Sequence, residues 1–383
     1  MLDKSQRQLL ELLKGSLWGV TIDQDLYGKG KVDWDEILSL SDEQTIIGLV
    51  SDAIATLPLE KRPPKSLFFL FIKKVGEIQE TNALLYKKIP LIFEKMHQKG
   101  IKVLLLKGQG ISLCYRNPYL RIPGDVDLYV GFDDDNYNRA NDLMNDIGAT
   151  KICEDSFKRH VEYVLNKISV EIHGEIKVNI NKQVKKTFKS WMEECLKEEW
   201  VTKKTSSSDI ICLPSYRFDS IFIFIHILTH YLNNGIGLRH VCDWACYLTK
   251  NHDKIDIDLL LKDINSLGLT RLWKVFAAMV VNRLGMKKEL MPLYDSSYHE
   301  KGDKLLSHIF ITGNFGLLQN KKENTYSNRI IRIFVFTYER LSLYLDNLGL
   351  FPQETIFCFQ QFVLRSFKKF YFRCLKSYNS ASS

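Results

Sequence analysis

Two carboxylates stand two residues apart in a segment that alternates between polar and apolar side chains. Asp125 and Asp127 flank Val126, and Leu128 continues the alternation. Side chains at positions i and i+2 of a β-strand project from one face, so a strand here directs both carboxylates to the same side. Neighbouring carboxylates repel one another, and a divalent cation with a preference for oxygen ligands, Mg²⁺ or Mn²⁺, relieves that repulsion. The pair predicts a metal site.

A third carboxylate, Glu171, lies on a later strand-like segment. Along residues 168–176, Glu171 and His173 share one face, whereas Val170 and Ile172 lie on the other. If this strand lies beside the one that carries the aspartates, Glu171 reaches the same metal ions. Asp125, Asp127 and Glu171 are therefore predicted to be both the catalytic residues and the metal ligands.

Cationic and glycine residues upstream of the carboxylates suit a phosphate group. Lys107 and Gly108 end a short apolar run, 102–106, that has the pattern of a buried strand, and a short helix is expected at 110–115. Glycine lets backbone N–H groups approach a phosphate, and a helix N-terminus favours an anion. Lys107 is expected to neutralise a phosphate oxygen, and Arg121 to clamp one with both arms of its guanidinium group. Together with paired metal ions, these residues indicate phosphoryl or nucleotidyl transfer.

The elements around these residues follow an α+β order. After helical residues 1–100, the pattern predicts a strand at 126–130, a helix from Asp133 to Ile147, and a hairpin of 158–165 and 168–176 joined at Asn166 and Lys167. The long N-terminal pattern predicts helices at 34–57, 66–87 and from Pro90 to Gly100. A helix at 182–198 and a short strand at 210–213 complete this unit. Further helices are expected at 218–231, 238–249, 257–267, 272–284, 330–348 and 353–378.

The composition is that of a globular chain with a basic balance. The 383 residues contain 45% hydrophobic and 26% charged residues, and the formal net charge is +8. This charge favours anionic partners. The apolar runs are too short to span a bilayer, no signal peptide is recognised, and the eight scattered cysteines are expected to be reduced thiols in a cytoplasmic protein. A basic aromatic helix after Gln353 is predicted to pack on the domain, or alternatively to make weak contact with a membrane or nucleic-acid surface.

The order of these motifs resembles the nucleotidyltransferase superfamily typified by DNA polymerase β. The segments 106–108 and 124–128, with Tyr115 and Arg121, are similar to an uncharacterised bacterial nucleotidyltransferase-like family with a Lys-Gly signature. Residues 170–173 and 238–243 also fit that family. The resemblance covers roughly residues 85–250. It implies a polymerase β-like core, a small mixed sheet with helices, between N-terminal helices and a C-terminal helical domain, with boundaries at 1–85, 86–215 and 216–383.

The resemblance also implies roles for individual residues. Asp125 and Asp127 would bind the catalytic metal ions, and Glu171 would help to activate the attacking hydroxyl. Gly108 would contact the triphosphate. The set expected to bind the nucleotide is Lys107, Gly108, Arg121, His173 and Arg239.

The predicted reaction moves a nucleoside monophosphate from a nucleoside triphosphate to an acceptor hydroxyl, with Mg²⁺ or Mn²⁺ as cofactor. The sequence does not specify the nucleotide or the acceptor, which is a protein, an RNA, a sugar or a small molecule. The alternative is a catalytically inactive nucleotide-binding or regulatory protein with the same fold. Two features favour this alternative: Gln109 stands where many superfamily members have Gly or Ser, and the segment between Gly108 and Asp125 is long. A nucleic-acid-binding protein that uses the basic C-terminus is a third possibility.

Three further pairs and clusters have two interpretations each. His226 and His230 are four residues apart and are expected to be satisfied core histidines, or else to face a cleft. Arg239 and Asp243 either pair along a helix or leave Arg239 for a phosphate or a base. The run Asp133 to Asp135 is predicted to cap a helix in preference to binding metal.

Overall fold

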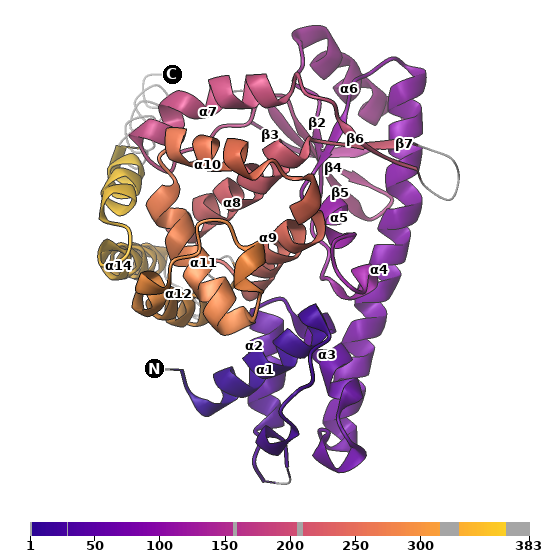
Figure 1. The fold of residues 1–383 in the computed structure, drawn as a ribbon. Helices are drawn as coiled ribbons and strands as arrows, with labels where there is room; N and C mark the ends of the chain where they lie inside the picture. Colours follow the sequence, from indigo (N-terminus) through magenta and orange to yellow (C-terminus); the bar gives the residue numbers. More distant parts are fainter. Residues whose placement is uncertain (1, 29, 156–158, 205–209, 315–328, 365–383) are drawn as a thin grey trace.

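The chain has an α+β fold with a small mixed sheet and many helices (Figure 1). The computed structural model describes residues 2–28, 30–155, 159–204, 210–314 and 329–364. Figure 1 shows three regions around the sheet: N-terminal helices below it, one long helix beside it, and a group of later helices opposite that long helix. The division at residues 85 and 215 stays a prediction, and its first boundary falls inside the long helix.

The N-terminal region packs three amphipathic helices, α1 (Lys4–Trp18), α2 (Trp34–Glu43) and α3 (Ile47–Thr56). Asp33 caps α2 as expected, because its carboxylate accepts a hydrogen bond from the Glu36 N–H. The single helix predicted for residues 34–57 is wrong, since Thr45 adopts a φ of 55° and divides it. The turn at Thr45 brings α3 back onto the rest of the chain, where Gly48 contacts the Leu120 carbonyl so closely that a Cβ would lie 2.1 Å from it.

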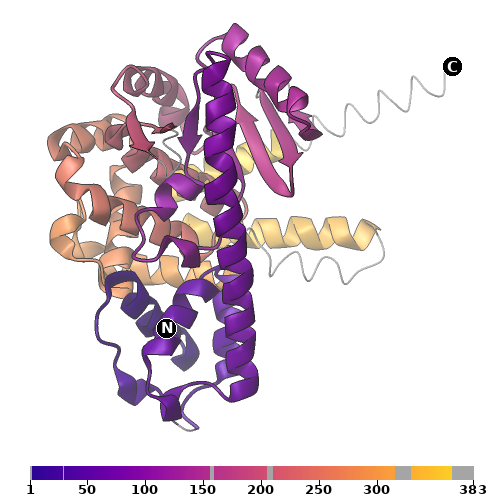
Figure 2. The ribbon, with the colours of Figure 1, turned by 90° about the vertical axis from the view of Figure 1, so that its right-hand side faces the viewer.

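Helix α4 (Lys65–Gln98) extends from the N-terminal helices to the sheet, as Figures 1 and 2 show. The sequence predicted two helices divided before Pro90, and this is wrong. Proline in a helix interior removes a hydrogen bond and costs about 3 kcal/mol. Here Pro90 is buried together with Ile89 and Phe93, and that burial offsets the cost.

The sheet that carries the predicted acids has five strands in the order β1-β2-β5-β4-β3. Its members are β1 (Leu104–Leu106), β2 (Val126–Tyr129), β3 (Thr150–Asp155), β4 (His160–Leu165) and β5 (Ile168–His173). The pairs are antiparallel except β2 with β5, which run parallel. The long connection between β2 and β5 contains α6 (Asp134–Asp146) and the β3–β4 strands. Parallel neighbours need such a crossover.

The expected hairpin is present, and the structure adds strands that the sequence did not predict. Asn166 and Lys167 have φ values of 50° and 70°, which is the conformation of a two-residue type I′ turn between β4 and β5. Strand β3 pairs with β4 and extends the sheet, and β6 (Val201–Lys204) pairs with β7 (Ile210–Leu213), which confirms the strand predicted at 210–213. Exposed residues dominate β3, so its alternation gave little signal.

Capping residues mark where the two helices next to the sheet begin. Asp133 accepts a hydrogen bond from the Asn136 N–H at the start of α6, which confirms a capping role for this acidic run. Asn181 caps α7 (Lys182–Cys195) in the same way through the Val184 N–H. Each such cap stabilises a helix by about 1 kcal/mol.

The later part of the chain is helical. Its elements are α8 (Tyr216–Asn233), α9 (Leu238–Asn251), α10 (Ile257–Ser266), α11 (Thr270–Leu284), α12 (His299–Thr312), α14 (Arg329–Leu348) and helical residues 352–364. A buried aromatic cluster joins α8, α9 and α11: the Phe224 ring lies 4.9 Å from Trp244 and 4.8 Å from Trp273. Aromatic pairs contribute about 0.5–1.5 kcal/mol beyond their burial. The cluster therefore fixes α8 and α9 relative to each other.

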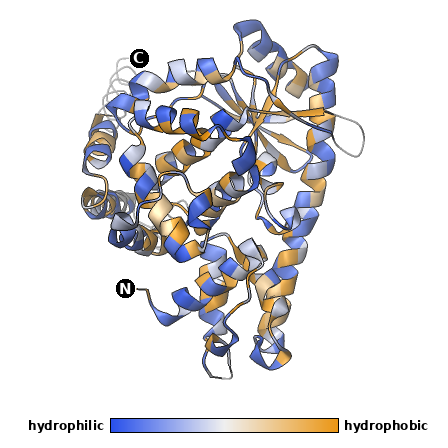
Figure 3. Ribbon diagram, in the orientation of Figure 1, coloured by the Kyte–Doolittle hydropathy of each residue, from blue (hydrophilic) through white to orange (hydrophobic). Residues whose placement is uncertain are grey.

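Hydropathy follows this arrangement. In Figure 3 the strands of the main sheet are largely hydrophobic, whereas outer helices such as α7 alternate between hydrophilic and hydrophobic residues. Among the described residues, no helix combines the length and the apolar character that a bilayer crossing requires. Most of the basic aromatic segment predicted after Gln353, including Lys368 and Arg373, lies outside the described residues.

Candidate active site

Strand pairing brings two of the three predicted acids side by side. Because β2 and β5 run parallel and in register, Asp127 lies directly opposite Glu171. Registered residues on neighbouring strands project from the same face. Asp125 precedes β2 by one residue, is exposed, and lines the same cavity as the other two acids. The shared face that the sequence predicted for Asp125, Asp127 and Glu171 is present.

A strained turn places Lys107 over this face. Lys107 follows β1 with a φ of 51°, a conformation that costs a residue with a side chain about 1–3 kcal/mol. Its Nζ lies 3.1 Å from the Asp127 Oδ1. Gly108, with a φ of 43°, begins α5 (Gly108–Ser112), and a Cβ there would lie 3.4 Å from the Asp125 carbonyl oxygen. The expected helix is present but has five residues, so its dipole contributes little and the turn itself is the relevant feature.

Two histidines, His160 and His173, contact the carboxylates of this face. His173 Nε2 lies 2.9 Å from Asp127 Oδ1 and 3.3 Å from Glu171 Oε2, and His160 Nε2 lies 3.2 Å from the same Glu171 oxygen. Burial raises the pKa of Glu171, but the hydrogen bonds from His160 and His173 outweigh it and hold the pKa well below its ordinary value. Burial lowers the pKa of His173, but hydrogen bonds to Asp127 and Glu171 prevail and raise it.

His160 is a residue that sequence reasoning missed. It lies opposite His173 in the antiparallel β4–β5 pair, and the two imidazole rings stack with centroids 4.7 Å apart. The predicted hairpin turn already fixed this register, since counting back from Asn166 and forward from Lys167 pairs the two histidines. The signal was therefore in the sequence.

Three histidines from α8 and α9 form the opposite wall of the cavity. The rings of His226 and His230 are 4.3 Å apart, and the ring of His240 lies 6.2 Å and 6.1 Å from them. Burial and then Lys107 lower the pKa of His226, and the same two causes lower that of His230 to about 4. Burial and then Arg239 lower the pKa of His240. All three are neutral at pH 7, and the interpretation of His226 and His230 as core residues is wrong, because both line the cavity.

Arg239, at the start of α9, lines the cavity close to the carboxylates. The residue is 9% exposed, and among the described residues its guanidinium group makes only long contacts, 3.4 Å from Nε to the Thr45 hydroxyl and 3.5 Å from Nη1 to the Ile122 carbonyl. Within the described part of the chain it makes no ion pair. Burial, followed by the charge of Arg121, lowers its pKa. A guanidinium group remains charged in proteins, so Arg239 is a buried cation that could bind an anionic ligand.

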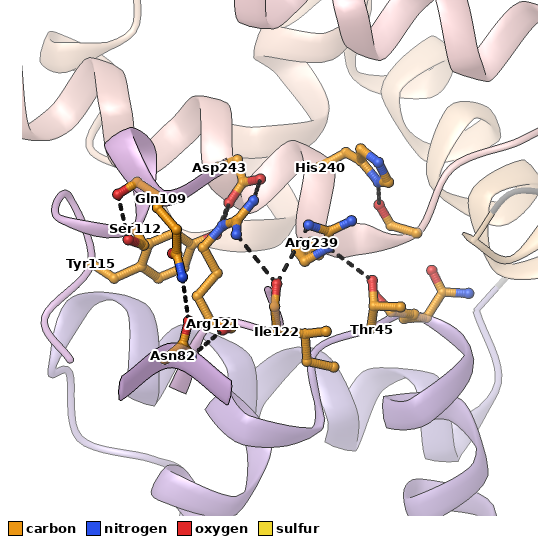
Figure 4. A network of polar contacts seen from close by, with 12 residues as sticks. Thr45, Asn82, Gln109, Ser112, Tyr115, Arg121, Ile122, Arg239, His240 and Asp243 are labelled. Atoms are coloured by element: carbon orange, nitrogen blue, oxygen red, sulfur yellow. Dashed lines mark hydrogen bonds and ion pairs between the residues drawn. The ribbon is translucent and has the colours of Figure 1, made fainter. Parts of the chain in front are cut away.

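Arg121 does not have the free guanidinium group that a phosphate clamp requires. Its Nε lies 2.7 Å from Asp243 Oδ1 and its Nη2 2.8 Å from Asp243 Oδ2, and both side chains are buried. The Tyr115 hydroxyl donates a third hydrogen bond to Asp243, at 2.6 Å. The network is drawn in Figure 4. It corrects two expectations: Arg121 is occupied by a carboxylate, and Asp243 pairs with Arg121 and not with Arg239.

Gln109 points away from the cavity. Its Nε2 donates a hydrogen bond to the Asn82 Oδ1 of α4 at 2.8 Å, and Asn82 in turn donates to the carbonyls of Tyr119 and Arg121. Figure 4 shows Gln109 directed toward Asn82. The larger side chain at this position therefore does not fill the space beside Lys107 and Asp127.

The cavity between these walls has a volume of about 300 Å³. The sheet side contributes Lys107, Gly108, Asp125, Asp127 and Glu171, and the helical side contributes the three histidines, Arg239 and two isoleucines. Two of the residues predicted to bind a nucleotide are placed differently. His173 contacts the carboxylates but does not line the cavity, and Arg121 lines the cavity but forms an ion pair with Asp243. The arrangement brings carboxylate oxygens, which could hold a metal ion, and cationic side chains, which could hold a phosphate, into one cavity.

Comparison with known proteins identifies one family and a similar structure. The sequence profile of a family described as uncharacterised nucleotidyltransferase matches residues 30–285. A crystal structure of an antigenic nucleotidyltransferase-like protein from Paracoccidioides brasiliensis is similar over 56% of this chain and 96% of that protein, with 14% identity and a TM-score of 0.34. No curated protein matches the chain.

Proposed function

We propose that this chain, which belongs to the uncharacterised nucleotidyltransferase family, transfers a nucleoside monophosphate from a nucleoside triphosphate to an acceptor hydroxyl. One observation carries the proposal: the parallel β2–β5 pair sets Asp127 beside Glu171 in a cavity that also contains Asp125, Lys107 and Arg239. Membership of the family supports a general nucleotidyltransferase role, and the residues of this cavity support the finer reaction.

The donor atoms fit a divalent cofactor. Asp125 makes no ion pair within the described residues, and Asp127 and Glu171 present carboxylates to the same face. These three residues would hold Mg²⁺ or Mn²⁺, which would neutralise phosphate charge and favour ionisation of the acceptor hydroxyl.

The cations of the cavity suit the triphosphate. Lys107 reaches over the Asp127 carboxylate, so its Nζ can contact a phosphate oxygen that approaches this residue. Arg239 enters from the opposite wall and offers a buried guanidinium group, whose hydrogen bonds to a phosphate would replace two long contacts. Gly108 lets the backbone of the turn approach without a side chain in between.

The remaining residues orient the reacting groups. His173 Nε2 lies 2.9 Å from Asp127 Oδ1 and orients that carboxylate, while the buried Arg121–Asp243 pair fixes the loop that leads into Asp125. His226 and His230 present neutral imidazoles that exchange hydrogen bonds with a hydroxyl or a base. The acceptor itself, whether protein, RNA, sugar or small molecule, is not specified by these contacts.

A labelling experiment tests the proposal. Purified protein is incubated with each α-labelled nucleoside triphosphate, Mg²⁺ and candidate acceptors, and transfer of label is measured. Asp125→Asn should lower the rate by roughly a thousandfold, because several kcal/mol of charge stabilisation is lost at about 1.4 kcal/mol for each tenfold change. Asp125 is exposed, so the substitution should leave the fold intact.

Asp146→Asn is the matched control, since Asp146 is an exposed acid on α6 outside the cavity. It should transfer label at the rate of the unchanged protein. Triphosphate binding that is insensitive to Mg²⁺ and to Asp125→Asn, without transfer to any acceptor, would instead support the inactive nucleotide-binding protein.

A further inference from the structure

The two histidines beside Glu171 give one part of the site a different donor chemistry from the rest. The ligand atoms of His160, Glu171 and His173 all lie within 4.8 Å of one another. They come from two neighbouring strands, β4 and β5, whose register sets the two imidazoles opposite each other. The side chains are only 17–22% exposed, so the group is partly shielded from water but still open to it.

The nitrogen–oxygen spacings at this group match those of neighbouring ligands of one metal ion. When ligands lie about 2.1 Å from an ion, adjacent ligand atoms are roughly 3.0 Å apart in an octahedron and roughly 3.4 Å apart in a tetrahedron. Glu171 Oε2 lies 3.2 Å from His160 Nε2 and 3.3 Å from His173 Nε2. Asp127 Oδ1 lies 2.9 Å from His173 Nε2. Both imidazoles also present the same nitrogen to one carboxylate oxygen.

The donor set selects a class of metal. Mg²⁺ prefers oxygen ligands and retains its waters, whereas imidazole nitrogen suits Zn²⁺ and transition metals such as Fe²⁺, Ni²⁺ and Cu²⁺. The acids at 125 and 127 offer oxygen alone, but Glu171 is accompanied by two nitrogens. The two halves of the acidic face therefore differ in the ion that each prefers.

We infer that His160, Glu171 and His173 form a binding site for a divalent transition-metal ion, with Asp127 shared between this ion and an oxygen-bound Mg²⁺. The inference rests on the proposed function for the role of the second ion, and it extends that function by making the two metal positions unequal. His160, which lies outside the cavity lining, becomes a ligand in its own right.

Titration with Co²⁺ tests the inference without any nucleotide. Visible absorption of Co²⁺ reports nitrogen ligation, and thiolate ligation gives a separate charge-transfer band. The unchanged protein should bind one equivalent of Co²⁺ that a roughly hundredfold excess of Mg²⁺ does not displace. His160→Gln and His173→Gln should each weaken binding by about tenfold or more.

His252→Gln is the matched control, because His252 also lies beside a carboxylate, 2.8 Å from Asp253, but on the surface and outside the site. It should bind Co²⁺ as the unchanged protein does. Thermal unfolding adds a second readout: Co²⁺ should raise the Tm of the unchanged protein and of His252→Gln, but raise that of His160→Gln much less. Circular dichroism without metal shows whether each variant is folded.

Two outcomes overturn the inference: folded His160→Gln that binds Co²⁺ as tightly as the unchanged protein, or Co²⁺ that equal concentrations of Mg²⁺ displace. Neither outcome depends on label transfer. If Co²⁺ binding requires His160 and no triphosphate is ever turned over, the metal site stands and the proposed function fails. If transfer of label requires Asp125 but neither histidine substitution weakens Co²⁺ binding, the proposed function stands and the metal site fails.

Discussion

Two buried arginines approach the same carbonyl oxygen from different parts of the chain, but their surroundings differ. Arg121 Nη1 lies 3.3 Å and Arg239 Nη1 3.5 Å from the Ile122 carbonyl, and both are drawn in Figure 4. The rest of the Arg121 guanidinium group bonds to both Asp243 oxygens, whereas Arg239 has no carboxylate among the described residues. A buried charge that is paired serves the fold, and a buried charge that is not paired is available to a ligand.

The largest expected effect is on the paired arginine. Arg121→Met should lower the free energy of unfolding by about 3–5 kcal/mol, because Asp243 would keep its buried charge without a cation. Urea denaturation measures the loss. Arg239→Met in the same experiment should change stability by less than about 1 kcal/mol, since no ion pair is broken. Equal losses would remove the contrast between the two residues.

Acid should destabilise the cavity wall next to Arg239. The pKa of His230 is lowered from 6.5 to about 4, so the unfolded chain takes up a proton below pH 6.5 that the folded protein refuses until about pH 4. This contribution is fully present above pH 6.5 and is lost as pH falls through 4, by up to roughly 3 kcal/mol. Unfolding free energies of His230→Gln between pH 7.5 and 4 should therefore fall less steeply. Parallel pH curves would contradict a buried neutral imidazole.

The unpaired arginine should matter most for the ligand. Arg239→Met should weaken binding of a non-hydrolysable triphosphate by about 10- to 100-fold, since a hydrogen bond to a charged group is worth about 1.5–3 kcal/mol. Calorimetric titration gives the dissociation constant. Arg116→Met removes the same charge from an exposed residue and should leave the constant unchanged. A similar loss in both variants would point to the net charge and not to this side chain.

The smallest expected effect comes from the hydrogen bond that Tyr115 donates to Asp243. Tyr115→Phe removes one of three hydrogen bonds to Asp243 and should lower the free energy of unfolding by about 1 kcal/mol. Burial, followed by the charge of Asp243, raises the pKa of Tyr115, so the hydroxyl stays protonated and donates. Thermal denaturation at pH 7 and pH 9 should give the same difference. A loss as large as that of Arg121→Met would mean that the hydroxyl, and not the guanidinium group, holds Asp243.

Local pattern predicted much of the acidic half of the site. The alternation around Asp125 and Asp127, the turn at Asn166 and the cap at Asp133 each depend on neighbours within a few residues, and each is present. The order of the motifs then predicted the α+β class. Strand β3 escaped prediction because it is exposed, and the continuous α4 because the burial that tolerates Pro90 is tertiary.

The contacts of Arg121 and Arg239 could not be predicted from local pattern, because they join residues that are far apart in the sequence. Spacing along the helix made Arg239 the predicted partner of Asp243, and Arg121 was predicted to clamp a phosphate. The fold decides otherwise, because the loop before β2 carries Arg121 to α9 from 122 residues away. His160 is an intermediate case, since its position opposite His173 follows from the hairpin once the turn is fixed.

The position of α9 opposite the acidic strands has a consequence for how the protein is made. Arg239 is held between Thr45 of the N-terminal helices and the Ile122 carbonyl, and Asp243 completes the anchor of the loop before Asp125. The ribosome releases the acidic strands well before it releases α9. A nascent chain that ends before residue 251 has its carboxylates but neither the wall that faces them nor the anchor that positions them. Competence to bind a triphosphate should therefore appear late in translation and in a single step.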